Sequence, residues 1–200
     1  MSKHICLFGG SITWGAWDYE KGGWGARLRS YLENNNHNII VYNCGVSGDT
    51  TSSFLKRFNV ECEARKPDVI IFSIGMNDSY YYGSKDKPSV PIEKFQDNLQ
   101  TLIDEAKTFC SNVIFVGLSL VDENKTKPIS WATTVYHDQE NTILYNNKIR
   151  EVSEKNNIPF VNILDCLDLN DIADGVHPNS VGHEKIFLRI KDFLLASKFL

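Results

Sequence analysis

The chain has 200 residues, of which 42% are hydrophobic, 12% are aromatic and only 6 are prolines. A chain of this size buries roughly 70% of the surface that its unfolded form exposes, so we expect a single domain over residues 1–200. The composition excludes collagen-like, low-complexity and disordered proteins. The 21 basic and 25 acidic residues leave a net charge of −4, which gives no electrostatic reason to bind nucleic acid or an anionic bilayer.

The five cysteines are scattered along the chain, with no C-x-x-C pair and no zinc-ribbon spacing. An odd, scattered set predicts free thiols in a reducing compartment. Near the N-terminus, the apolar run at residues 5–8 ends at Gly9 and is too short for a signal sequence or a membrane span. We therefore expect a cytoplasmic protein without stable membrane insertion, and the sequence sets no oligomeric state.

Short apolar runs alternate with amphipathic segments along the whole chain. The runs rich in Val, Ile and Phe have the pattern of strands covered on both faces, at residues 3–8, 38–43, 68–74, 112–118 and 159–163. Apolar residues recur at helical spacing in the segments 24–32, 54–62, 92–109, 143–152 and 186–194. Asn179 and Ser180 are candidate N-caps of the last helix.

This alternation predicts an α/β fold, a three-layer α/β/α sandwich around a flavodoxin-like five-stranded parallel sheet. In such a sheet, ligands bind beyond the carboxyl ends of the strands. The segments that follow the strands therefore form the candidate site, and they lie at residues 9–15, 44–50, 75–82, 119–138 and 174–178.

These segments contain the residue types that acyl transfer requires. Ser11 follows two glycines at the end of the first strand, where a substrate carbonyl can approach its hydroxyl closely. His177 is the candidate base, and Asp174, three positions earlier, is placed to orient its imidazole through Nδ1. The backbone N–H groups of Ser11 and Gly48 and the side-chain amide of Asn77 are the candidate donors of an oxyanion hole.

Four motifs in chain order carry a family resemblance: FGGSIT at residues 8–13, GVSGDT at 45–50, GMND at 75–78 and DGVHP at 174–178. This set resembles the SGNH hydrolases, also called GDSL-type lipases or esterases. The resemblance implies Ser11 as nucleophile, Gly48 and Asn77 as oxyanion donors, Asp174 and His177 as the other triad members, and ester hydrolysis without a metal or cofactor. One departure is Gly10, which stands where the family has an aspartate outside the triad.

A competing interpretation from another functional class is a flavodoxin-like module that binds a phosphate or nucleotide on residues 9–13 without turnover. It is weakened because no Walker lysine and no G-x-G-x-x-G follow the first strand. A further alternative is transfer of the acyl group to an acceptor other than water. The sequence favours a serine hydrolase acting through an acyl-enzyme on small or short-acyl esters, with acetylated sugars and lysophospholipids among the options.

Several aromatic and histidine side chains fall in the same segments. We expect some of them to line a substrate pocket beneath a partial lid at residues 119–138, with Trp14, Tyr80, Trp131, Tyr136 and His137 as candidates. Tyr80–Tyr82 is also a candidate for self-association. His183 is expected to face solvent or cap the last helix rather than bind a metal, and His4 is expected to be structural at the opposite end of the sheet.

Overall fold

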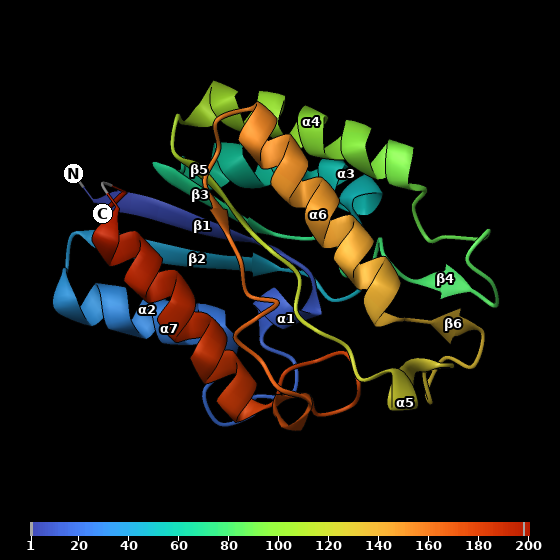
Figure 1. Ribbon diagram of the computed structural model, residues 1–200. Helices are drawn as coiled ribbons and strands as arrows, with labels where there is room; N and C mark the ends of the chain where they lie inside the picture. The colour runs from blue at the N-terminus through green and yellow to red at the C-terminus, as the bar shows by residue number, and fades with distance from the viewer. Residues whose placement is uncertain (1, 198) are drawn as a thin grey trace.

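The computed structural model describes residues 2–197 and 199–200 and is built on a parallel sheet (Figure 1). Its strands are β1 (Lys3–Gly9), β2 (Ile39–Gly45), β3 (Val69–Ser73), β5 (Val113–Val116) and β7 (Phe160–Val161). The five strands lie in the order β2-β1-β3-β5-β7, and every neighbouring pair is parallel. The predicted flavodoxin-like sheet is therefore confirmed, with strand ends that differ from the expected ones by a few residues.

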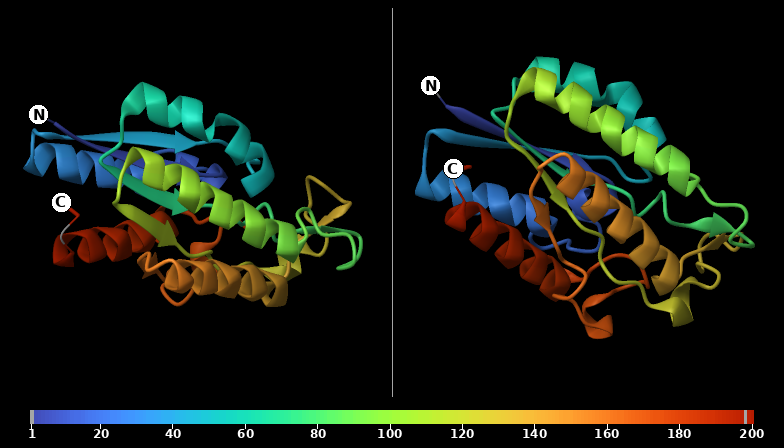
Figure 2. Two further views of the ribbon diagram at one scale, coloured as in Figure 1. Left: turned by 90° about the horizontal axis from the view of Figure 1, so that it is seen from above. Right: turned by 45° about the horizontal axis from the view of Figure 1, so that its top comes forward.

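Helices cover both faces of this sheet (Figures 1 and 2). On one face, α2 (Gly23–Asn35) packs against α7 (Ser180–Ala196). On the other face, α4 lies between its neighbours α3 and α6, with the bounds α3 (Thr51–Arg65), α4 (Ile92–Phe109) and α6 (Gln139–Lys155). All five correspond to helices that the apolar spacing predicts, so the three-layer sandwich is confirmed.

The helix ends have clear local causes. Thr50 and Ser53 form a capping box at the start of α3, which satisfies two backbone groups that the first turn leaves free. Asn179 accepts hydrogen bonds from the backbone of Val181 and Gly182, so it is the N-cap of α7 and Ser180 is the first helical residue. These caps fix where α3 and α7 begin. Both starts lie beside the rim of the sheet, by which we mean the loops at the carboxyl ends of its strands that carry the candidate residues.

The core lies between the sheet and its two helical layers. Strand β1 is buried from Ile5 to Gly9, and the Phe8 ring packs against Phe54 and Phe58 on α3 with ring centroids 5.3 Å apart in both pairs. Burial of each such side chain stabilises the fold by roughly 1.5–3 kcal/mol. The rigid sheet that results gives the loops at its carboxyl edge a fixed base.

Short elements that the sequence did not predict lie at the carboxyl edge. They are α1 (Ser11–Trp14), α5 (Glu123–Thr126), a 3-10 turn at Leu169–Asp171, and an antiparallel pair formed by β4 (Tyr81–Tyr82) and β6 (Val135–Tyr136). In Figure 1, β2 points toward the side on which α1, β4, β6 and α5 lie. Elements of two to four residues are too short to show a hydrophobic period, so only the structure shows them.

The cysteines and the helices can be compared with the expectations of free thiols and of no membrane span. The five cysteines are free thiols. Within residues 2–197 and 199–200, no helix is both long enough and apolar enough to cross a bilayer.

Candidate active site

Ser11 is placed by a glycine turn between β1 and α1. A Cβ atom at Gly9 would collide with the Ser73 carbonyl oxygen and the Thr13 side chain, so only glycine fits there. A Cβ atom at Gly10 would come within 3.0 Å of the Asn77 side-chain nitrogen. The chain therefore leaves β1 close to Asn77, and Ser11 becomes the first residue of α1, with 8% of its surface exposed.

Ser11, His177 and Asp174 form a continuous hydrogen-bonded chain, although the serine lies 166 positions before the histidine. The Ser11 Oγ atom is 2.8 Å from His177 Nε2, and His177 Nδ1 is 2.7 Å from Asp174 Oδ2. These distances suit transfer of a proton from the serine hydroxyl to the imidazole. The structure thus brings together the three residues that the sequence proposes as a triad.

A backbone hydrogen bond closes the turn that contains Asp174 and His177. The Ala173 amide donates to the His177 carbonyl at 2.8 Å, and Gly175 adopts a φ of +104° that side chains rarely tolerate. The Asp174 Oδ1 atom accepts from the amides of Val176 and His177 at 3.0 and 2.8 Å. The carboxylate is therefore oriented by the turn before it meets the imidazole.

Asp174 is held in its ionised form. Burial by itself raises the pKa of this carboxyl, but the hydrogen bonds from the His177 side chain and from two backbone amides outweigh burial and hold the pKa below its ordinary value. An ionised carboxylate beside Nδ1 keeps the proton on that nitrogen. Nε2 is then free to accept the proton of Ser11.

The residues that carry the three candidate oxyanion donors, Ser11, Gly48 and Asn77, line one cavity. Asn77 donates one side-chain hydrogen to the Asp49 carbonyl at 2.9 Å, which leaves its second hydrogen for a ligand. Gly48 has a φ of +84°, and no atom lies within 4 Å of the position its Cβ would take. Among the described residues, the amides of Ser11 and Gly48 donate no hydrogen bond within the protein. They remain available to an oxyanion.

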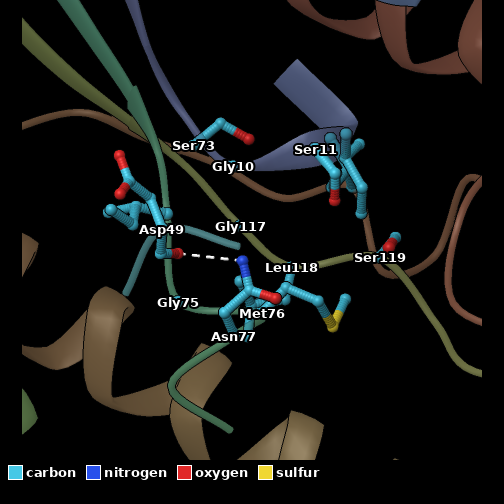
Figure 3. Close-up of a pocket in the computed structure, with 13 residues that line it drawn as sticks. Gly10, Ser11, Asp49, Ser73, Gly75, Met76, Asn77, Gly117, Leu118 and Ser119 are labelled. Atoms are coloured by element: carbon cyan, nitrogen blue, oxygen red, sulfur yellow. Dashed lines mark hydrogen bonds between the residues drawn. The ribbon is translucent and has the colours of Figure 1, made fainter. Parts of the chain in front are cut away.

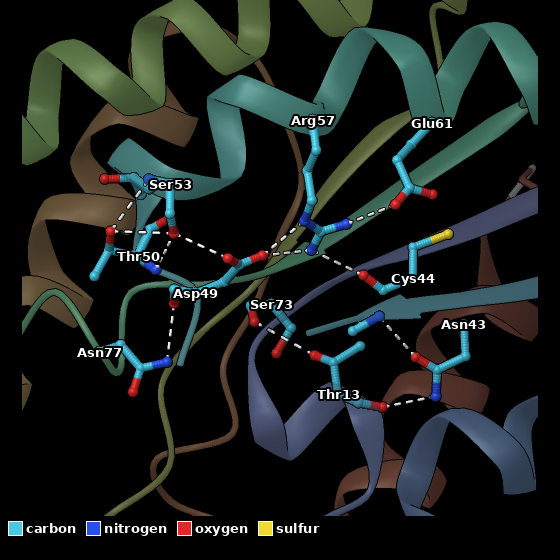
Figure 4. A network of polar contacts seen from close by, with 12 residues as sticks. Thr13, Asn43, Cys44, Asp49, Thr50, Ser53, Arg57, Glu61, Ser73 and Asn77 are labelled. Atoms are coloured by element: carbon cyan, nitrogen blue, oxygen red, sulfur yellow. Dashed lines mark hydrogen bonds and ion pairs between the residues drawn. The ribbon is translucent and has the colours of Figure 1, made fainter. Parts of the chain in front are cut away.

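The loop that contains Gly48 is tied to α3 by a polar network (Figure 4). Arg57 donates to the Asp49 carboxylate at 2.7 Å, to the Cys44 carbonyl at 3.0 Å and to Glu61 at 3.1 Å. Ser53 donates to the other oxygen of Asp49 at 2.9 Å. Asp49 is also the residue whose carbonyl holds Asn77, so the network connects α3 to two of the candidate donors.

Two cavities meet at Ser11 and Asn77. The larger has a volume of about 210 Å³ and is lined by both residues together with Ser47, Gly48, Tyr80, Ile129, Trp131, Ala132, Val135, His137, Val176 and His177. The smaller has a volume of about 20 Å³ and lies toward the ends of β3 and β5 (Figure 3). Its walls include Ile74, Met76, Leu118 and the unpartnered hydroxyl of Ser119.

Three of the five predicted pocket residues reach the larger cavity. Trp131 lies over His177 with ring centroids 6.2 Å apart, and Tyr80 meets His137 edge to face at 5.5 Å. His137 is 2% exposed, and this burial lowers its pKa to about 4, so its imidazole is neutral near pH 7. The segment at 119–138 thus overhangs the triad.

The other two predicted pocket residues, Trp14 and Tyr136, do not line this cavity. Trp14 ends α1 and is 60% exposed. Tyr136 belongs to β6, where its ring stacks on Tyr81 at 5.7 Å. Tyr81 is itself buried and donates to Asp138 at 3.0 Å. This tyrosine pair therefore packs the overhanging segment instead of contacting a substrate.

The expectation for His183 is wrong. His183 is fully buried, accepts from the Trp24 amide at 3.2 Å through Nδ1 and lies 2.9 Å from the Ala16 carbonyl through Nε2. It joins α7 to α2 and to the loop between α1 and α2, and burial lowers its pKa to about 4. His4 contacts the Arg65 carbonyl at 2.6 Å at the start of β1, far from the rim as expected.

Within the described residues, no cluster of three or more acidic, histidine or cysteine side chains is arranged to hold a metal ion.

Sequence reasoning missed one contact at the triad. The indole nitrogen of Trp17 lies 2.5 Å from Asp174 Oδ2, although Trp17 is 157 positions away in the chain. The only sequence signal was that this aromatic residue follows closely after the candidate segment at residues 9–15. Ser47, Ile129, Val135 and Val176 were also not anticipated as lining residues.

Comparison with known proteins agrees with this architecture. A model of the GDSL-like Lipase/Acylhydrolase family matches residues 7–185. An acetylxylan esterase of Geobacillus stearothermophilus is 27% identical over 165 residues, which cover 76% of this chain and 71% of that protein. A GDSL esterase/lipase of Arabidopsis thaliana is 24% identical over 205 residues, covering 94% of this chain and 83% of the relative.

Solved structures show the same fold. A lipase/acylhydrolase from Enterococcus faecalis superposes with a TM-score of 0.79 at 24% identity, covering 97% of this chain and 96% of that one. The acetylxylan esterase Axe2 from Geobacillus stearothermophilus superposes with a TM-score of 0.75 at 22% identity, covering 99% of this chain and 96% of the other.

Proposed function

The chain belongs to the GDSL-like lipase/acylhydrolase family, and from this membership and the rim geometry we propose that it is a serine esterase that hydrolyses short-acyl esters through an acyl-enzyme. Its activity is that of a carboxylic ester hydrolase, and its substrate is a small-molecule ester. The observation that carries the proposed mechanism is the hydrogen-bonded chain from Ser11 Oγ through His177 to Asp174.

In the proposed reaction, Ser11 Oγ attacks the ester carbonyl while His177 Nε2 takes the hydroxyl proton. The carbonyl oxygen becomes an oxyanion that accepts hydrogen bonds from the Ser11 and Gly48 amides and the Asn77 side chain. The tetrahedral intermediate collapses, the ester C–O bond breaks, and His177 gives its proton to the departing alkoxide. Water, deprotonated by His177, then attacks the acyl-serine and releases the acid and the serine hydroxyl.

The two cavities support a division between a small acyl group and a larger alcohol. A space of about 20 Å³ is enough for one water-sized group, which corresponds to the methyl of an acetyl ester. The cavity of about 210 Å³ presents the Trp131 ring and the neutral His137 imidazole, and no lysine or arginine is among its lining residues. These features favour acetyl esters of neutral, ring-shaped alcohols, including acetylated sugars, over lysophospholipids with a charged headgroup.

The alternative of a phosphate- or nucleotide-binding module without turnover has no support in this site. The Ser11 hydroxyl is engaged by His177 instead of facing an anion site, and α1 is only four residues long.

We also propose a cytoplasmic location, which the five free thiols favour.

The test is hydrolysis of a chromogenic acetyl ester by the wild type, by Ser11→Ala and by Ser30→Ala, an exposed serine of α2. We expect Ser11→Ala to lose at least ~10³-fold in kcat, since the nucleophile is removed, and Ser30→Ala to match the wild type. Equal rates for the wild type and Ser11→Ala would refute the mechanism. Mass spectrometry of the quenched reaction should show an acetyl group on Ser11, and product analysis separates hydrolysis from acyl transfer.

A further inference from the structure

Trp17 has an unusual backbone conformation close to the triad. It lies in the loop between α1 and α2 with a φ of +65°, in the left-handed region that large side chains rarely occupy. Such conformations persist only where surrounding contacts impose them, and they cluster at functional sites. The side chain is 42% exposed, so burial of the indole ring alone does not explain why the loop adopts it.

The contact that distinguishes Trp17 is made by its indole N–H. Nε1 lies 2.5 Å from Asp174 Oδ2 and 3.1 Å from His177 Nδ1. When Nδ1 carries the proton that it donates to Asp174, it has no free lone pair to accept a second one. The indole therefore donates to the carboxylate, and it shares Oδ2 with His177.

This bond completes the hydrogen bonding of the Asp174 carboxylate. Oδ1 accepts from the amides of Val176 and His177, and Oδ2 accepts from His177 Nδ1 and Trp17 Nε1. A carboxylate has about four lone-pair sites, and all four are occupied here. Three of the donors come from the turn that contains Asp174, and only Trp17 comes from a distant part of the chain.

We propose that Trp17 is a positioning residue for the Asp174–His177 pair, which fixes the carboxylate and reduces its pull on the histidine proton. The inference rests on the proposed function. A carboxylate relieved of one donor carries more negative charge toward His177 and stabilises the protonated imidazole, which is inactive as a base. Without the indole N–H, the enzyme should therefore need a higher pH to become active.

Other titratable groups near Asp174 and His177 do not account for such a shift in the pH that activity requires. His137 lines the same cavity as His177, and His183 on α7 contacts Trp24 and Ala16 with its two ring nitrogens. Burial lowers the pKa of both histidines to about 4. Both are neutral over the range of about pH 5–8 in which a histidine base titrates. Arg27 forms ion pairs with Asp18 and Glu184 instead of contacting the Asp174–His177 pair.

The experiment measures the rate at which a fluorophosphonate labels Ser11, as a function of pH, in the wild type, Trp17→Phe and Tyr19→Phe. Tyr19 packs edge to face on Trp17 at 5.8 Å and is 84% exposed, so its variant is a matched control. For Trp17→Phe we expect the acidic limb to move up by roughly half a pH unit and the limiting rate to fall about 3–10-fold, with the half-saturating probe concentration unchanged. Tyr19→Phe should match the wild type.

A second substitution separates the hydrogen bond from ring packing. β-(3-Benzothienyl)alanine at position 17 keeps the shape of the indole and lacks the N–H, so it should behave as Trp17→Phe does. The indole proton resonance of Trp17 should also lie downfield in the wild type and move upfield in Asp174→Asn. An unshifted acidic limb in both position-17 variants, with normal labelling of the wild type, overturns this inference, whereas no labelling of the wild type overturns the proposed function.

Discussion

Asp78, the residue next to the candidate oxyanion donor Asn77, is a fully buried carboxyl group. It accepts hydrogen bonds from the backbone amide and the hydroxyl of Thr51 at 2.9 and 2.5 Å, at the start of α3. Burial disfavours its charged form and raises its pKa from 3.8 to about 6, although the bonds from Thr51 act in the opposite direction. This residue therefore couples folding to pH.

The sign of that coupling follows from linkage. Between pH 3.8 and about 6 the folded chain keeps a proton that the unfolded chain has released, so the contribution of Asp78 to stability is complete below pH 3.8 and disappears as the pH rises through 6. We expect the free energy of unfolding of the wild type, relative to Asp78→Asn, to fall by about 2 kcal/mol between pH 4 and pH 7. Denaturant unfolding at several pH values measures this difference.

The control for this prediction is Asp97→Asn, because Asp97 is an exposed carboxylate of α4. Asp97→Asn retains Asp78 and should therefore lose stability between pH 4 and pH 7 as the wild type does. A pH-independent difference between the wild type and Asp78→Asn would contradict the proposed titration of Asp78.

At the scale of elements, α3 holds the loop that contains Gly48, a candidate oxyanion donor, and the Asp49 carbonyl to which Asn77 donates. Arg57 on this helix binds the Asp49 carboxylate and the Cys44 carbonyl, and Asp49 in turn accepts from Asn77. Arg57 and Asp49 are largely buried, with side chains 21% and 11% exposed. Through these bonds, α3 positions the loop that carries the candidate oxyanion donor Gly48.

Arg57→Met removes these bonds and keeps the apolar stem. We expect kcat for an acetyl ester to fall about tenfold with KM nearly unchanged, because a displaced oxyanion donor costs less than the ~10²–10³ that its complete removal costs. Steady-state kinetics measure both constants. Arg29→Met is the control, since Arg29 forms an exposed ion pair with Glu33, and such pairs contribute little to stability. A kcat for Arg57→Met equal to that of Arg29→Met would show that α3 does not position the donor.

The length of an element decides whether its sequence pattern predicts it, as α4 and the strands β4 and β6 show. The bounds of α4 agree with the predicted range 92–109, because its apolar stripe repeats over many turns and buries one continuous face. In contrast, β4 and β6 have two residues each and pair across more than fifty positions of chain. The two strands are joined by stacking of Tyr81 on Tyr136, which are distant in the sequence. A hydrophobic pattern within either segment therefore does not predict the pairing.

At the scale of the whole molecule, the sheet and its loops divide the space around Ser11 unequally. The cavity of about 20 Å³ lies toward the strand ends, and Leu118, which is 3% exposed, forms part of its wall. The cavity of about 210 Å³ lies under the loop that carries Trp131. The narrow side is bounded by the rigid sheet, so the length of the acyl group should be limited more strictly than the size of the alcohol.

Leu118→Ala enlarges the narrow side. We expect the ratio of kcat/KM for a butyryl ester to that for an acetyl ester to rise about tenfold or more, since one methylene in an apolar pocket changes specificity by roughly 10–200-fold. The truncation also removes about 2–5 kcal/mol of stability, so activity is measured well below the melting temperature. Leu102→Ala, which truncates a fully buried leucine of α4, is the matched control and should leave the ratio unchanged. An unchanged ratio in Leu118→Ala would place the acyl group elsewhere.

The sequence by itself determined the order of strands and helices and the three-layer class, because hydrophobic periodicity and helix caps act over a few residues. It also pointed to Ser11, Asp174, His177, Gly48 and Asn77, because a parallel sheet places the loops after its strands on one edge. The structure then brought the Ser11 hydroxyl to the His177 ring across 166 positions. The catalytic roles of these residues stay predictions until the variants are assayed.

Only the tertiary structure decided which side chains surround these groups. It buried His183 against Trp24 and Ala16, turned Tyr136 toward Tyr81, and placed the Trp17 indole on the Asp174 carboxylate. Each of these contacts joins residues that are far apart in the chain, so it depends on how the loops pack and leaves no local pattern. A short sequence carries the propensities and motifs of its own segment, whereas hydrogen bonds between segments are set by the packed fold.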